Sequence, residues 1–180
     1  KKSEKVGIHC RVFNPLTPGL NVFLNNRDHR KITVIDGKVG FTGGYNLANE
    51  YFNFTHPYGQ WKDTGIRLEG EAVHSLTVTF LEMWNAVSDK DKNDSDFNKF
   101  LLSTDYQAKQ TGFIQPYADS PMDNEQVGEE VYIRMANKAE KYCWFMTPYL
   151  ILPDKIKHAL CLAAKRGFNV RILSPCFHGK

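Results

Sequence analysis

The sequence contains no long hydrophobic run. None of its apolar stretches approaches the ~18 residues that a membrane-spanning helix requires, and its start, KKSEKVGIHC, lacks the apolar segment of a signal peptide. We therefore expect these 180 residues to be soluble by themselves. Because the chain starts without methionine and stops at NVRILSPCFHGK, we also expect it to be a fragment of a longer protein.

Cysteine is scarce, and no two cysteines form a CxxC pair. A disulfide framework or a zinc module would need more cysteines or closer spacings. His158 with Cys161, and Cys176 with His178, have poor spacings for zinc, so we expect no metal site. The interpretation that we favour is buried free thiols in a reducing compartment, at Cys10, Cys143, Cys161 and Cys176.

A strong charge bias is also missing. The chain has 23 Lys and Arg against 20 Asp and Glu, a net charge of +3, which does not by itself indicate a nucleic-acid partner. Neither low-complexity segments nor short repeats occur, and 42% of the residues are hydrophobic, as in ordinary globular domains. We expect no nucleic acid as partner, while an anionic ligand stays compatible with this charge.

Sequence periodicity predicts strands and helices in alternation. In the first part, we expect strands at 6–13, 32–36, 39–42 and 61–70, and a short helix starting near 46–52. Asp36-Gly37 is a hairpin-turn signal. Apolar residues at three- and four-residue steps predict an amphipathic helix over 71–87.

A polar, charged stretch at 88–98 is a predicted linker, and a second α/β pattern follows it. There we expect strands at 113–118, 141–150 and 168–175, and helices at 125–141 and 154–167. This alternation is typical of a layered α/β fold with parallel strands. An exposed sheet edge in such a fold predicts possible self-association.

The stretch HRKITVIDGKVGFTGGYN (29–46) carries the candidate chemistry. Because side chains alternate along a strand, we expect His29 and Lys31 to share one face with Thr33. A histidine beside a permanent cation has reason to stay neutral, and therefore nucleophilic, near pH 7. The cation can hold a phosphate oxygen while the imidazole attacks phosphorus. Asp36 points to the other face, so we expect it to brace the turn or to pair with a nearby cation.

Two glycines and an asparagine follow the hairpin. Gly43 and Gly44 allow a sharp turn or a close approach of the backbone to a ligand, and Asn46 supplies an amide donor. Each residue alone has an ordinary structural explanation. Together, they predict an anion cradle next to a nucleophile.

The joint pattern, HxKxxxxD followed by GGxN, resembles the signature of the phospholipase D superfamily, with His29, Lys31 and Asp36 as its HKD triplet. The flanking words GGYNLANEY and WKDTGIRLEG most resemble bacterial cardiolipin synthases, and the resemblance covers nearly the whole chain. It implies a layered α/β/α sandwich with a mostly parallel mixed sheet, incomplete in this chain. It also implies a phosphohistidine mechanism that needs no cofactor, with phosphatidylglycerol and other anionic phospholipids as partners.

The same resemblance implies roles for further residues. Lys31 and Asn46 would hold phosphoryl oxygens, and an acidic residue would fix the histidine tautomer. Asp63 is the first candidate for that acid and Glu50 the second, although Asp63 has an alternative as a structural cap of its strand.

The family needs two HKD motifs in one active site, and this sequence contains one. We therefore expect 1–112 to be the later part of a first repeat and 113–180 the early part of a second, truncated before its motif. Alone, the chain is expected to be inactive, and the longer protein to associate with the bacterial cell membrane. A phospholipase D or nuclease-like phosphodiesterase and a non-catalytic phosphate-binding module stay open as alternatives.

Overall fold

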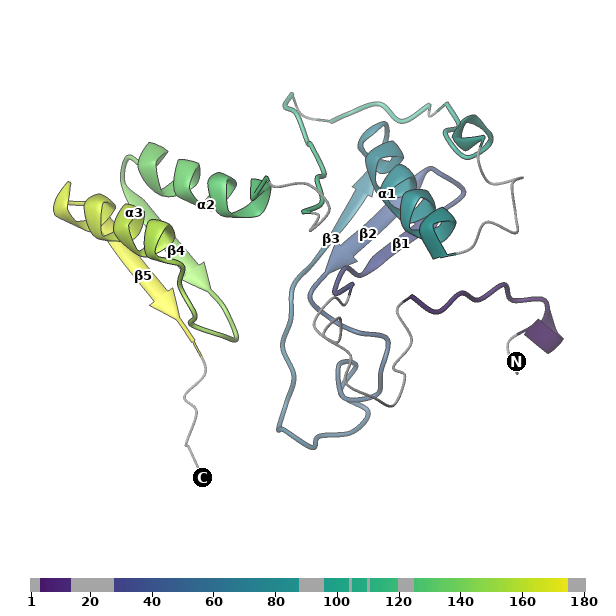
Figure 1. Cartoon of the computed structure of the whole chain (residues 1–180), viewed down its shortest axis with the longest axis horizontal. Coiled ribbons are helices and arrows are strands. Elements are labelled where there is room, and N and C mark those ends of the chain that lie inside the picture. Colours follow the sequence, from purple (N-terminus) through teal and green to yellow (C-terminus); the bar gives the residue numbers. More distant parts are fainter. Residues whose placement is uncertain are drawn as a thin grey trace. The chain divides into compact units, whose positions relative to one another are not determined.

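The computed structural model describes residues 4–13, 28–87, 96–103, 105–109, 111–119 and 125–174. The chain divides into two compact units, an N-terminal unit, Lys1–Tyr117, and a C-terminal unit, Ala118–Lys180. Each unit combines strands with helices (Figure 1), which confirms the predicted α/β class. Our assignment of the two parts to successive repeats, with a boundary at 112/113, stays a prediction.

The N-terminal unit is built on an antiparallel sheet of three strands in the order β1-β2-β3. These strands are β1 (Ile32–Ile35), β2 (Val39–Gly43) and β3 (Gly65–Glu69). Antiparallel pairing follows from the tight hairpin between β1 and β2, which returns the chain immediately beside itself. The ladder pairs Ile32 with Thr42 at one end and Ile35 with Val39 at the other.

The hairpin turn has the geometry that its sequence predicts. Asp36 and Gly37 have positive φ values of 54° and 65°, as in the turns that match the twist of paired strands. The Lys38 backbone N–H closes the turn by donating to the Ile35 carbonyl at 3.0 Å. Asp36 therefore lies in the turn itself, while its predicted roles, bracing the turn or pairing with a nearby cation, stay predictions.

A single long helix covers one face of this sheet. Helix α1 (Ala72–Val87) buries Val73 and Leu76 against Leu68 of β3, and Ile32 and Val34 of β1 pack against this cluster. Along β1, half-buried and exposed residues alternate, so the predicted two-residue periodicity is confirmed from Ile32 onward. The remaining described helical turns of this unit are the short 3-10 helices η1 (Glu4–Val6) and η4 (Phe97–Lys99).

The C-terminal unit contains a parallel pair, β4 (Tyr142–Met146) and β5 (Asn169–Leu173), with α2 (Val127–Lys138) and α3 (Asp154–Lys165). A parallel pair needs a crossover, and α3 supplies it. The core joins Ala136 of α2 to Ala159 and Leu160 of α3, over the Cys143 and Phe145 side of β4. Both helices therefore cover the same face of the pair (Figure 1).

Several predicted elements are wrong. Residues 6–13 form no strand: Val6 ends the η1 turn, and the residues after it are irregular. Residues 46–52 form turns rather than a helix, and residues 113–118 are irregular. Part of the predicted linker, 88–95, lies outside the described residues. A strand needs a partner to pair its backbone groups, and among the described residues none pairs with 6–13 or 113–118.

The buried-thiol prediction is also wrong in part. Cys10 and Cys161 are free but exposed, and Cys143 is half-buried. Burial raises the pKa of the Cys143 thiol. Cys176 and His178 lie outside the described residues, and within those residues no group of three or more His, Cys, Asp or Glu is arranged to hold a metal.

Candidate phosphate-binding site

The segment before β1 is organised by local polar contacts. Strand β1 begins at Ile32, so His29 and Lys31 precede it and the predicted shared strand face does not extend to them. The Asp28 carboxylate instead accepts hydrogen bonds from the Arg30 backbone N–H at 3.0 Å and from its guanidinium at 2.8 and 2.9 Å. Such contacts within a segment compete with ladder hydrogen bonds, which explains the late start of the strand.

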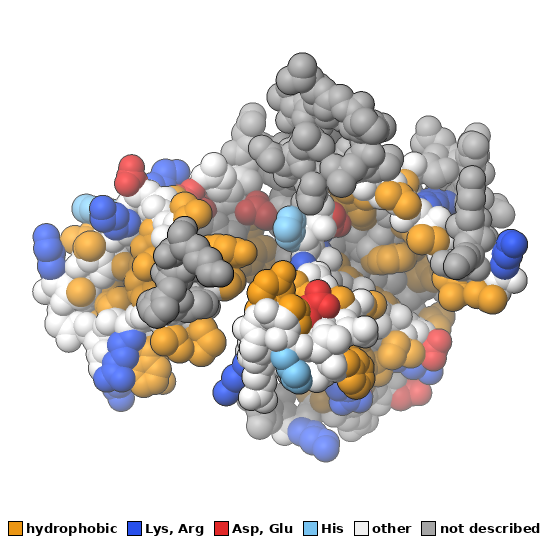
Figure 2. Space-filling model, turned by 90° about the horizontal axis from the view of Figure 1, so that it is seen from below, with side chains coloured by type: hydrophobic (Ala, Val, Ile, Leu, Met, Phe, Trp, Pro, Cys, Tyr) orange, Lys and Arg blue, Asp and Glu red, His pale blue; other side chains and the backbone are white. Residues whose placement is uncertain are grey.

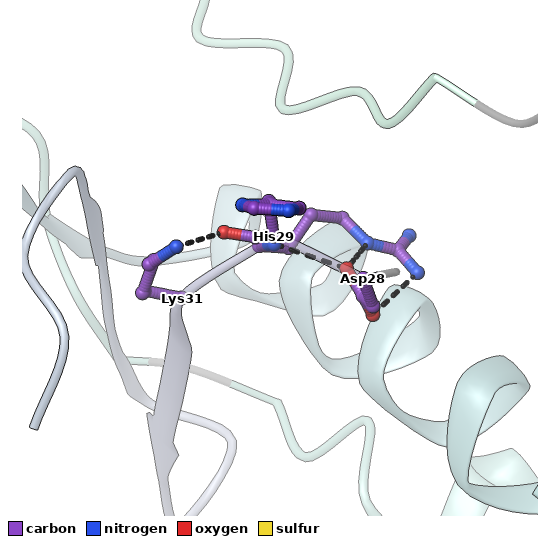
Figure 3. Close-up of polar contacts among 4 residues, drawn as sticks. Asp28, His29 and Lys31 are labelled. Atoms are coloured by element: carbon purple, nitrogen blue, oxygen red, sulfur yellow. Dashed lines mark hydrogen bonds and ion pairs between the residues drawn. The ribbon is translucent and has the colours of Figure 1, made fainter. Parts of the chain in front are cut away.

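The ion pair changes the titration of both partners. Its side-chain hydrogen bonds lower the pKa of Asp28 and raise the pKa of Arg30. Lys31 turns back along the chain and donates from its ammonium to the His29 carbonyl (Figure 3). His29, which is exposed, thus lies between an ion pair and a lysine that contacts its own backbone.

Three of the predicted residues line one cavity. A cavity of about 330 Å³ at the open end of the β1–β2 hairpin is bordered by Lys31, Gly43 and Asn46. The ladder explains this grouping, because Ile32 pairs with Thr42, and Lys31 and Gly43 are the next residues at that end. The other lining residues are Arg30, Ile32, Thr33, Phe41, Thr42, Tyr45 and Leu47.

The cavity has the electrostatics of an anion site. None of the described residues that line it is acidic, while Lys31 supplies an ammonium, Asn46 an amide, and Thr42 a hydroxyl. Within this set, Arg30 is already paired with Asp28, whereas the hydrogen bond from Lys31 goes to a neutral carbonyl. Lys31 is thus the cation with charge to offer to a bound anion.

The two predicted glycines, Gly43 and Gly44, have different neighbours. Gly43 pairs with Gly65 of β3, and the Tyr45 ring lies against both. At Gly44, an added Cβ would collide with the carboxylate of Asp63. The missing side chain of Gly44 therefore makes room for Asp63.

Asp63 is held in place next to the loop that follows β2. Its carboxylate accepts hydrogen bonds from the Thr64 backbone N–H at 2.8 Å and from the Trp61 indole at 3.3 Å. Both contacts are local, so the structural explanation for Asp63 has direct support. The tautomer-fixing functions of Asp63 and of the half-buried Glu50 stay predictions.

Asp36 and His29 are the predicted catalytic residues outside the cavity lining. Asp36 lies at the turn, five residues beyond Lys31 and at the other end of β1, about 17 Å away along the strand. His29 is joined to the cavity through Lys31, which contacts it and lines the cavity.

Thr42 and Tyr45 were missed from the sequence. Thr42 could have been found by extending the hairpin register to its open end, opposite Ile32. Tyr45 had no local signal, because its position depends on the Gly43–Gly65 pair, which joins strands more than 20 residues apart.

The N-terminal unit thus has a cavity that is lined by a lysine, an amide and a hydroxyl, with no acidic side chain among the described lining residues, and this lining suits an anionic ligand. No family model matches the chain. An uncharacterized protein of Streptococcus mutans is 48% identical over 175 residues, 97% of this chain and 37% of that protein.

Two further relatives are named for an activity. The probable cardiolipin synthase YwiE of Bacillus subtilis is 36% identical over 97% of this chain and 34% of its own length. A cardiolipin synthase of Alkalihalophilus pseudofirmus is 37% identical over 94% of this chain and 33% of its own length. The chain spans about a third of the length of these curated relatives. It is homologous, along nearly its whole length, to a segment of bacterial cardiolipin synthases, which confirms the resemblance drawn from the sequence.

Proposed function

We propose that this chain provides one phosphate-binding half of the active site of a cardiolipin synthase-type phosphatidyltransferase. The observation that carries the proposal is the cavity that Lys31, Gly43 and Asn46 line together, with no carboxylate among the lining residues that the structure describes. The likeness to proteins named cardiolipin synthase supports a phospholipid as the source of the phosphate. The two units would then be parts of consecutive phospholipase D-like repeats of a longer, membrane-associated protein.

The proposed reaction has two displacements at phosphorus. In the first, an imidazole nitrogen attacks the phosphodiester of one phosphatidylglycerol, the bond to the glycerol headgroup breaks, and a second histidine protonates the leaving glycerol oxygen. In the second, a hydroxyl of another phosphatidylglycerol attacks the phosphohistidine and gives up its proton to that second histidine. The products are cardiolipin and glycerol, and the histidine nucleophile is regenerated without a cofactor.

Within this scheme, His29 is one of the two histidines, either the nucleophile or the general acid. Lys31 and Asn46 stabilise the charge that develops on the phosphoryl oxygens. The partner histidine comes from outside these 180 residues or from another chain, because the sequence has one HKD motif. The 180-residue chain alone is therefore expected to bind phosphate and to turn over no lipid.

The test is a turnover assay of the longer protein that carries this chain, with labelled phosphatidylglycerol in mixed micelles. The His29→Asn variant is compared with His158→Asn, a matched change at another exposed histidine. A four-acyl product that disappears in His29→Asn and persists in His158→Asn is the expected result. Equal activity of both variants would remove His29 from the chemistry.

The product also separates the alternative reactions. Phosphatidic acid alone would mean that water is the acceptor, and the protein would be a phospholipase D. Cleavage of a simple phosphodiester or a nucleic acid, with no lipid product, would support the histidine chemistry and show that the substrate is not a phospholipid.

A further inference from the structure

The loop that leaves the candidate phosphate-binding cavity carries several exposed apolar side chains next to the cavity wall. We define residues 45–58, between β2 and β3, as the rim loop. Leu47 lines the cavity and is nevertheless 85% exposed, and Phe54 and Tyr58 are 77% and 83% exposed. Figure 1 shows the segment between β2 and β3 projecting beyond the ends of these strands, away from the covered sheet. Exposed apolar patches of this kind are typical of interaction surfaces.

The rim loop is connected to the cavity wall by a row of aromatic rings. Tyr45 borders the cavity, its ring centroid lies 6.5 Å from that of Phe52, and the Phe52 ring lies 6.3 Å from that of Phe54. Tyr45 also packs against Gly65, which anchors the row to the sheet. Figure 2, seen from the side toward which this loop projects, shows hydrophobic side chains exposed on it. A row of three aromatic rings thus starts at the cavity wall and runs outward along the rim loop.

The cavity and the rim loop together are complementary to an amphiphilic partner. Lys31 offers a positive charge in the cavity, and apolar and aromatic side chains begin directly at its edge. Aromatic side chains prefer the boundary between lipid headgroups and acyl chains, where one end can be apolar and the other wet. An anionic phospholipid has this arrangement, because its phosphate is attached to apolar chains.

We propose that the rim loop is a membrane-docking surface, which places Leu47, Phe54 and Tyr58 among the lipids of an anionic bilayer while Lys31 faces a headgroup phosphate. The lipid identity of that phosphate rests on the proposed function. Docking itself requires no turnover, so it is a property of this chain even without a second histidine.

The test is cosedimentation of the 180-residue chain with vesicles of phosphatidylcholine alone and of phosphatidylcholine and phosphatidylglycerol in equal parts. The rim variant is Leu47→Ser with Phe54→Ser. Its control is Ile151→Ser with Met146→Ser, two side chains of the C-terminal unit with matching exposure, 86% and 79%. All four side chains are exposed, so the variants should keep the fold, and circular dichroism checks that they do.

We expect the rim variant to bind vesicles that contain phosphatidylglycerol about tenfold more weakly, since partial burial of two such side chains corresponds to at least this factor. The control variant should change binding by less than about twofold. Equal loss in both variants would mean general hydrophobic adhesion and would overturn the proposal. A wild-type chain that binds neither vesicle would also overturn it, as would a rim variant that changes only self-association.

Lys31→Gln separates this inference from the proposed function. We expect it to reduce the preference for phosphatidylglycerol over phosphatidylcholine, because the phosphatidylglycerol headgroup carries a net negative charge and the phosphatidylcholine headgroup carries none. If the rim variant loses binding while Lys31→Gln keeps the full preference for phosphatidylglycerol, the docking surface is supported and the phosphate-holding function of Lys31 is refuted.

Discussion

Asp28 and Arg30 form a bidentate ion pair across His29. The Arg30 guanidinium donates to both carboxylate oxygens of Asp28, at 2.8 and 2.9 Å, and its backbone N–H adds a third bond. Both residues also line a cavity of about 360 Å³ against α1, with Phe80 and Trp84. The Asp28–Arg30 pair, which flanks His29, thus borders the cavity that residues of α1 also line.

We predict that Asp28→Asn loosens the segment around His29. Both residues are exposed, so the loss of the pair should cost at most about 1 kcal/mol of global stability. Locally, amide hydrogen exchange at His29 and Lys31 should become faster. Glu69→Gln, which breaks the similarly spaced Arg67–Glu69 pair on β3, is the control and should leave exchange at His29 unchanged. Unchanged exchange in Asp28→Asn would show that the pair does not order this segment.

The pH dependence of this segment follows from the lowered pKa of Asp28. A carboxyl whose folded pKa lies below its unfolded value of 3.8 adds stability that is present above that value. This contribution is lost as the pH falls through the lower, folded pKa. The Arg30 Nε–H resonance should therefore lose its hydrogen-bonded shift only in acid, below the ordinary carboxyl range. In Asp28→Asn the shift should be absent at every pH, and an identical acid profile in both proteins would contradict the assignment.

The close approach of Gly44 to Asp63 predicts a rescue by a second mutation. Gly44→Ala introduces a Cβ that collides with the Asp63 carboxylate, and such overpacking typically costs ~1–3 kcal/mol. Asp63→Ala removes the obstacle, so the double variant should be more stable than the sum of the single changes predicts. Urea denaturation of the four proteins measures this coupling. Additive effects would mean that the two residues do not meet in solution.

Arg166 is predicted to hold the end of α2. Its guanidinium donates to the carbonyls of Ala136 and Asn137, both at 2.8 Å, in the last turn of that helix, where carbonyls lack helical partners. Arg166→Ala should destabilise the C-terminal unit by about 1–3 kcal/mol, because hydrogen bonds from a charged donor are lost. Lys165→Ala, its neighbour, is the control and should cost less than about 0.5 kcal/mol. Thermal denaturation compares the two, and similar melting temperatures would refute the capping interaction.

The two separate cores predict separate effects of core mutations. Leu76→Ala should destabilise the N-terminal unit by about 2–5 kcal/mol, and Leu160→Ala should do the same to the C-terminal unit. Two-dimensional NMR should show resonances lost from 32–87 in the first variant and from 127–173 in the second. Joint loss of both sets in either variant would show that the units unfold as one.

The sequence by itself determined the local elements of this protein. Apolar spacing predicted α1, α2 and α3 within a few residues at each end, and Asp36-Gly37 predicted the hairpin, because both signals depend on neighbouring residues. The HxKxxxxD and GGxN spacings, together with the flanking words GGYNLANEY and WKDTGIRLEG, also indicated the relatives.

Only the tertiary structure decided how the candidate residues meet. It brought Lys31, Gly43 and Asn46 to one cavity, left Asp36 at the opposite end of β1, and placed Asp63 against Gly44. It also showed that the segments 6–13 and 113–118, which look like strands, have no strand partner among the described residues. These outcomes depend on ladder register and on contacts between residues far apart in the sequence. Propensity and periodicity report only on neighbours along the chain, so they carry no information about such contacts.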